Sequence, residues 1–75
     1  MQFNAIIEKD KNGYFAYIPE LKGCYSQGDS FEEALINIRE AAEVYVESLD
    51  DEEKKEIKNK SFFIAPINVQ PLKVV

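Results

Sequence analysis

The stretch PELKGCYSQGDSFEE, residues 19–33, decides the fold that the sequence predicts. Pro19 has no backbone N–H group, so it marks the end of a strand or a place on a sheet edge. Gly23 allows the chain to reverse sharply. Residues 24–27 are short and extended in character, and Gly28 bounds them. The stretch therefore predicts a turn and a third strand that lie directly before a helix.

The helix signal that follows is the clearest in the sequence. Ser30 offers its hydroxyl as N-cap and Glu33 stands three residues later, which is the spacing of a capping box. Asp29 adds negative charge at the positive end of the helix dipole. Apolar residues then recur at helical spacing, namely Phe31, Ala34, Leu35, Ile38, Ala42, Tyr45, Val46 and Leu49. Ile36 and Val44 fall outside this stripe and hint at a second contact surface.

The N-terminal part predicts a β-hairpin. Residues 2–9 alternate in polarity, and one face of the expected strand carries Phe3, Ala5 and Ile7. The pair Asn12-Gly13 is a strong hairpin signal, because both residues accept positive φ at low cost. Residues 14–18 are aromatic, which suits the second strand.

The C-terminal part is less regular. Residues 50–60 begin with acids and end with bases, an order that suits a short second helix, although a solvated linker is the alternative. Residues 61–75 are apolar, and Pro66 and Pro71 confine them to an edge strand or to short strand pieces. The predicted fold is α+β in the order β-β-β-α-(α)-β, with a small antiparallel sheet that carries the long helix on one face.

Composition and charge limit the function. The 75 residues suffice for one domain, and domains of this size often gain stability by oligomerising. The net charge of −5 repels phosphate backbones, so direct nucleic-acid binding is not expected. The single cysteine fits a reducing cytosol, and neither a signal peptide nor an apolar run of membrane-spanning length is visible. We therefore expect a cytoplasmic protein that does not associate with membranes.

Catalytic and metal sites are not indicated. The chain has no histidine, which removes the commonest general base and the commonest zinc ligand. Cys24 is interpreted as a small buried hydrophobe rather than a reactive thiol, because only Lys22 stands near it as a cation. Asp29, Glu32 and Glu33 are interpreted as helix capping rather than metal binding, because no second ligand cluster converges on them. We expect no enzymatic activity and no cofactor.

The acidic residues are unevenly distributed. Between residues 29 and 53 there are ten acidic residues and one basic residue, Arg39. A solvated helix face is the default interpretation of such a run. A field of one sign over this length also steers a basic protein toward the surface. A basic protein partner is therefore the natural hypothesis.

These motifs resemble those of the HicB antitoxin family. Residues 14–30, YFAYIPELKGCYSQGDS, match its pattern Y-x-A-x-x-P-E-L-x-G-C-x-S-x-G-D-[ST], and EEA at 32–34 and NIREA at 37–41 match the helix that follows. The resemblance implies a partial ribonuclease-H-like fold without the catalytic acids of ribonucleases H. It also implies a dimer or higher assembly, and a partner, the small basic toxin HicA, which cleaves messenger RNA.

Charge and resemblance together lead to expectations for single residues. Partner contacts are expected at Tyr17, Glu20, Asp29, Glu40, Glu43 and Glu47. Structural roles are expected for Pro19, Gly23, Cys24, Gly28, Ser30 and Glu33. A homodimer or homotetramer interface is expected at Ile6, Phe15, Ile64, Ile67 and Val69. Whether the last fifteen residues exchange between subunits stays open.

The favoured function is that of an antitoxin that neutralises a HicA-type toxin by occluding it. We expect a short, stand-alone HicB-like domain over residues 1–75 without a C-terminal DNA-binding domain, because the sequence PLKVV is not followed by a basic extension. The alternative is an orphan HicB-like scaffold or binding module that forms a homo-oligomer without a toxin. A carboxylate- and metal-dependent nuclease rests on fold analogy alone and ranks below both.

Overall fold

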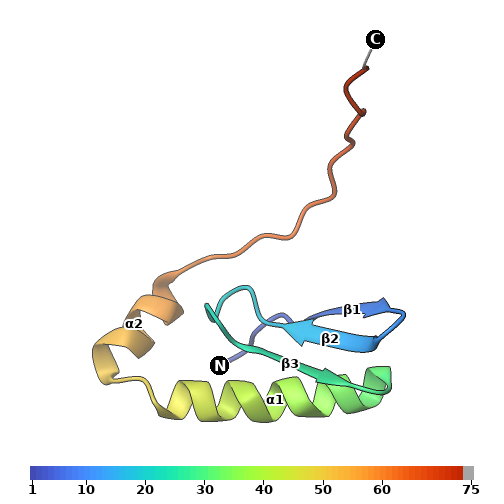
Figure 1. Ribbon diagram of the computed structural model, residues 1–75. Coiled ribbons are helices and arrows are strands. Elements are labelled where there is room, and N and C mark those ends of the chain that lie inside the picture. The colour runs from blue at the N-terminus through green and yellow to red at the C-terminus, as the bar shows by residue number, and fades with distance from the viewer. Residues whose placement is uncertain (74–75) are drawn as a thin grey trace.

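The computed structural model describes residues 1–73 and shows one small sheet followed by two helices (Figure 1). The strands are β1 (Ile6–Asp10), β2 (Gly13–Tyr17) and β3 (Tyr25–Gly28), and the helices are α1 (Phe31–Glu47) and α2 (Asp51–Asn59). The sheet is antiparallel and has the order β1-β2-β3. The predicted α+β class and the first five elements, including the second helix, are therefore confirmed.

The first two strands form the predicted hairpin, with two differences in detail. β1 begins at Ile6, so residues 2–5 are not part of the strand. Positive φ falls on Gly13 alone, at +125°, and not on Asn12 as well. Asn12 instead donates its backbone N–H to Oδ1 of Asp10 at 2.7 Å. This side-chain turn closes the hairpin without a left-handed conformation at Asn12.

The strand register divides the sheet into two faces. Ile7 lies opposite Ala16, and Ala16 lies opposite Ser26. Ala16 is fully buried and belongs to the core, so this face is turned toward α1. Because side chains alternate along a strand, the face turned away from α1 carries Ile6, Phe15, Tyr17 and Tyr25.

Each helix begins with a side-chain cap. Oγ of Ser30 accepts the Glu33 N–H at 3.1 Å. Oε1 of Glu33 accepts the N–H of Asp29 at 3.3 Å, so the reciprocal half of the expected box lies one residue before the cap. At the start of α2, Asp50 and Glu53 form a complete box, with bonds of 2.8 and 3.0 Å. This box stabilises residues 51–59 as a helix, so the alternative of a solvated linker is wrong.

A small core lies between the sheet and α1. It consists of seven buried residues, Ala16, Ile18, Leu21, Cys24, Ala34, Ile38 and Ala42. Three of them are alanines, so the sheet and the helix lie close together. α1 runs mainly along β3 and β2, and it covers β1 least (Figure 1). One edge of the sheet is therefore well covered, and the other is open.

The strand predicted at residues 61–75 is wrong for the part that the structure describes, and residues 74–75 lie outside that part. Residues 61–73, the C-terminal tail, belong to no helix or strand, and every one of them is exposed. The radius of gyration is 15.6 Å, against about 11 Å for a compact chain of this length. The tail extends away from the rest of the chain (Figure 1). A strand needs a neighbour to pair with, and residues 61–73 have none among the described residues of their own chain.

Gly28 sets the distance between the end of β3 and the start of α1. A Cβ atom at position 28 would lie 2.6 Å from the backbone nitrogen of Ala34 and 2.9 Å from the carbonyl carbon of Glu33. Both are backbone atoms, so relief would require the strand and the helix to move apart. Any side chain here would open the close-packed contact between the two layers.

We predict that Gly28→Ala lowers the free energy of unfolding by about 2–3 kcal/mol, because overpacking at rigid backbone atoms strains the native state. Chemical denaturation followed by circular dichroism measures this change. Gln27→Ala is the control, since Gln27 is exposed on the same strand, and it should cost less than about 0.5 kcal/mol. Wild-type stability of Gly28→Ala would show that α1 does not lie this close to β3.

Candidate protein-binding faces

The outer face of α1 combines acidic and apolar side chains, and we call it the acidic helix face. Glu40, Glu43 and Glu47 are exposed and stand three and four residues apart, so they share one side of the helix. Ile36 and Val44 lie among them, and Val44 is 72% exposed. Exposed apolar side chains within a charged surround are typical of protein-binding surfaces. Three of the six residues predicted for partner contact thus lie together.

The face of the sheet turned away from α1 is aromatic, and we call it the aromatic sheet face. The ring centroid of Phe15 lies 6.1 Å from that of Tyr17 and 5.8 Å from that of Tyr25. Ile6 pairs with Tyr17 in the register and completes the group. Tyr17 was predicted to contact the partner, and Ile6 and Phe15 to form an oligomer interface. The structure places these three side chains on one surface, on the far side of the molecule from the acidic helix face.

Glu20 and Asp29 lie apart from both faces. The carboxylate of Glu20 accepts the backbone N–H of Asn4 at 3.0 Å and its side-chain amide at 3.2 Å. Glu20 thereby ties the N-terminal segment to the connector between β2 and β3. Asp29 is exposed next to the first turn of α1. The residues predicted for partner contact therefore do not form one site, and the acidic helix face is their largest group.

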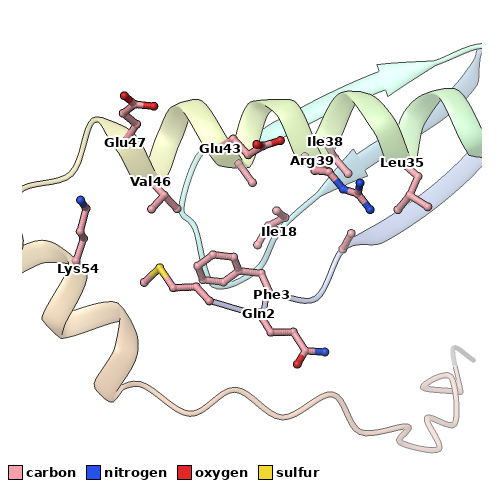
Figure 2. A pocket seen from close by; sticks show the side chains of 13 residues that line it. Gln2, Phe3, Ile18, Leu35, Ile38, Arg39, Glu43, Val46, Glu47 and Lys54 are labelled. Carbon is pink, nitrogen blue, oxygen red and sulfur yellow. The ribbon is translucent and has the colours of Figure 1, made fainter.

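A groove beside residues 1–5, the N-terminal segment that leads into β1, is the feature that the sequence pattern missed. It has a volume of about 890 Å³ and lies between the N-terminal segment and α1 (Figure 2). Its apolar lining includes Phe3, Ala5, Ile18, Leu35, Ile38 and Val46, and charged residues on its border include Arg39, Glu43, Glu47 and Lys54.

The width of the helix stripe explains why this groove was missed. Leu35 and Val46 belong to the apolar stripe of α1, but three strands are too few to cover the whole stripe. Leu35 consequently remains 39% exposed. A comparison of stripe width with the number of available strands is the signal that would have indicated the groove.

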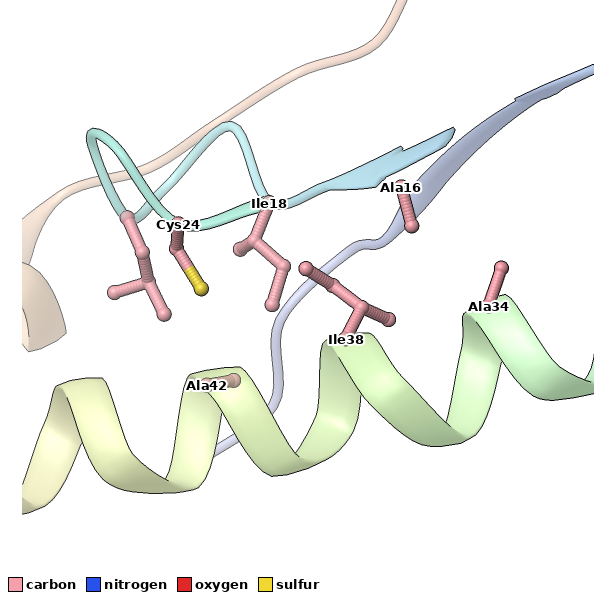
Figure 3. Packing of buried hydrophobic residues seen from close by; sticks show 7 residues of the cluster. Ala16, Ile18, Cys24, Ala34, Ile38 and Ala42 are labelled. Atoms are coloured by element: carbon pink, nitrogen blue, oxygen red, sulfur yellow. The ribbon is translucent and has the colours of Figure 1, made fainter. Parts of the chain in front are cut away.

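The connector between β2 and β3 folds tightly over one leucine. The Leu21 N–H donates to the Ile18 carbonyl and the Cys24 N–H to the Leu21 carbonyl, both at 3.0 Å. The Ile18 N–H donates to the Cys24 carbonyl at 3.2 Å, which closes the loop. Leu21 is 1% exposed. The loop thus covers part of the core. The side chains of Ile18 and Cys24 point from it toward α1 (Figure 3).

The residues expected to shape this connector lie at its bends. Pro19 lies two residues after the end of β2 at Tyr17. Gly23 has φ +82°, a conformation that side chains other than glycine's rarely adopt. A Cβ atom there would meet nothing within 4 Å, so the demand for glycine is purely conformational.

Cys24 faces the core instead of a ligand site. It is 4% exposed and belongs to the cluster between the sheet and α1. Burial raises the pKa of its thiol, because the thiolate would lose its hydration. A thiol with a raised pKa in apolar surroundings is a poor nucleophile.

The three residues predicted for an oligomer interface in the tail are exposed and stand apart from the other two. Ile64, Ile67 and Val69 lie in the extended C-terminal tail. Ile6 and Phe15 lie on the aromatic sheet face. The five residues therefore do not form one surface on a single copy of the chain.

Within residues 1–73, no group of three acidic or cysteine side chains is placed to hold a metal ion. None of the helices there has the length and apolar character needed to cross a membrane.

Comparisons with known proteins point to one family. A family model described as HicB_like antitoxin of bacterial toxin-antitoxin system matches residues 3–71. A UPF0150 protein of Helicobacter pylori is 55% identical over 69 residues, which are 92% of this chain and 96% of the relative. A UPF0150 protein of Synechocystis is 43% identical over 68 residues, 89% of this chain and 85% of that protein. A UPF0150 protein of Archaeoglobus fulgidus is 36% identical over 75 residues, 99% of this chain and 96% of that protein. No solved structure matches.

We predict that the Cys24 thiol of the native protein reacts with a thiol-specific dye at least about tenfold more slowly than that of the denatured protein, because the dye must wait for the core to open. Absorbance of the released chromophore at pH 8 measures both rates. A Cys24→Ala variant that carries Gln27→Cys is the control, because its thiol is exposed, and it should react rapidly without denaturant. Equal rates for native and denatured Cys24 would contradict its burial.

Proposed function

The chain belongs to the HicB-like antitoxin family of bacterial toxin–antitoxin systems, and from this premise we propose that it neutralises a small basic toxin that cleaves messenger RNA. The match over residues 3–71 is the observation that carries the proposal. The family is generally non-catalytic, and in this proposal the chain is not an enzyme and uses no cofactor. It acts in the cytoplasm by covering the surface with which a HicA-type toxin holds RNA.

Charge complementarity supports the acidic helix face as the contact surface. A protein that binds RNA presents positive charge to the phosphate backbone. Between residues 29 and 53 this chain carries ten acids against one base, Arg39. Glu40, Glu43 and Glu47 concentrate part of this charge around exposed Ile36 and Val44. The charges would guide encounter and the apolar side chains would supply affinity on contact.

We further propose that the chain acts as a homodimer or homotetramer and does not itself bind nucleic acid. Support comes from the small core of seven residues and from the uncovered aromatic sheet face. A core of this size gives little stability alone, so burial of further apolar surface between copies would add to it.

We predict that Glu40→Lys/Glu47→Lys weakens binding to the toxin by at least about tenfold, or about 1.4 kcal/mol. The physical reason is that two attractive contacts with a basic surface become repulsive. The probe is the small basic protein encoded next to this chain, produced as a catalytically inactive variant and titrated by calorimetry. Growth of cells that express the active toxin with each variant gives the functional readout.

Glu52→Lys/Glu56→Lys is the matched control, because it makes the same change in net charge on the exposed side of α2. It should retain binding and growth rescue. Equal weakening by both pairs would indicate an effect of net charge alone and would contradict the assignment to the acidic helix face. Absence of any toxic neighbour that this chain relieves would overturn the antitoxin proposal and favour the orphan scaffold.

A further inference from the structure

We propose that the C-terminal tail of one copy pairs with the β1 edge of a second copy and lays its apolar side chains over the groove there. The inference rests on the self-association proposed above and specifies the segments that meet. It follows from the composition of the tail, from the position of its prolines, from the open edge beside the groove and from the path of the tail.

The tail has the composition of a buried strand but is exposed. Residues 61–72, SFFIAPINVQPL, contain no charged side chain. Phe63 is 89% exposed, and Ile64, Ile67 and Val69 are also largely exposed. A continuous apolar segment in water marks a surface that another element covers. The neutral tail also suits a groove with an apolar lining.

Between residues 63 and 69 one side of the tail carries no proline and is free for strand pairing. In an extended strand, residues two apart share a side-chain face and direct their N–H groups to the same side. Phe63, Ala65, Ile67 and Val69 form such a set, and none is proline. Pro66 falls in the opposite set and removes a donor only from the other side, whereas Pro71 has the parity of the apolar set and limits the pairing to residues 63–69. The tail can therefore pair along one side, as an edge strand does.

The β1 edge offers the unpaired strand that the tail needs as a pairing partner. β1 is the edge strand that α1 covers least, and the groove lies between α1 and residues 1–5, which lead into β1 (Figure 2). A strand that pairs with β1 and continues beside residues 1–5 would place alternate side chains over Phe3, Leu35 and Val46. The apolar set of the tail has the spacing that this arrangement requires.

The direction in which the tail runs favours pairing with a second copy over pairing with its own chain. Phe62 still lies near Phe3 and Ile57, since the three line one shallow pocket. From Phe63 onward the tail leaves its own chain (Figure 1), and Pro66 and Pro71 stiffen it against folding back. Reciprocal exchange about a two-fold axis would let each copy donate one tail and receive one.

The first test traps the pairing with a disulfide. Glu8 lies on the β1 face turned away from α1, since it is opposite Phe15 in the register. In a Cys24→Ala background, Glu8→Cys is combined in turn with Ile64→Cys, Asn68→Cys and Gln70→Cys, which share the outward parity of the tail. After mild oxidation, non-reducing gels and peptide mass mapping identify the linked cysteines.

We expect at least one of these pairs to give a covalent dimer in which position 8 of one chain is joined to the tail of another. A monomer closed by an internal disulfide would overturn the proposal, because the tail would then pair with its own β1. The absence of any link to the tail in all three pairs would overturn it as well, and would leave the tail free for a different protein.

The second test uses neighbouring residues of opposite parity. Ile67→Asp places a charge on the set that faces the groove, whereas Asn68→Asp places the same charge on the outward set. Light scattering should give the wild type and Asn68→Asp the same oligomeric mass, and Ile67→Asp a mass reduced at least twofold. Circular dichroism checks that each copy remains folded. A monomeric wild type, or an unchanged mass of Ile67→Asp, would contradict tail exchange.

These tests also separate tail exchange from the antitoxin function. If Ile67→Asp retains its wild-type mass yet the chain rescues growth from the toxin, the exchange is wrong and the proposed function stands. If the disulfide dimer forms and no neighbouring protein is toxic, the exchange stands and the proposed function fails.

Discussion

The close approach of α1 to β3 is the contact on which the rest of the structure depends. At Gly28 the strand passes so near the helix that a Cβ atom would lie 2.6 Å from the Ala34 nitrogen. The buried side chains of Ala16 and Ala34 keep the two layers close along the same contact. The helix is held against β3 and covers β1 least, and a groove of about 890 Å³ lies between α1 and residues 1–5. The tight contact at one edge of the sheet thus accompanies an open edge at the other.

Local signals in the sequence predicted the elements, but not which elements meet. The capping pattern at Ser30 and the pair Asn12-Gly13 act within a few residues, so a helix and a hairpin were predictable there. The predicted strand was wrong for residues 61–73, because apolar, β-branched residues do not supply a pairing partner. Charge and resemblance placed Glu20 among the expected partner contacts, and the structure shows that its carboxylate also holds Asn4. This bond joins residues that are 16 positions apart, so no local pattern indicates it.

In this account α1 contributes side chains to two different binding surfaces. Its outer side carries Glu40, Glu43 and Glu47 for a basic partner, and its side next to β1 carries Leu35 and Val46 for the tail of a second copy. Glu43 and Glu47 also border the groove, so self-association would leave Glu40 and the exposed side chains of Ile36 and Val44 free. Two such faces in one assembly would also bind two toxin molecules, or one toxin dimer with the gain in effective concentration that linkage provides.

The most direct test of the central claim is the composition of the complex that the protein forms in its own cells. The tagged chain would be purified from its source organism, and native mass spectrometry would identify every subunit and their stoichiometry. The account predicts a stable complex with one small basic protein, encoded nearby, whose toxicity this chain relieves. A homo-oligomer without a second protein, from cells in which no neighbouring gene is toxic, would contradict the account.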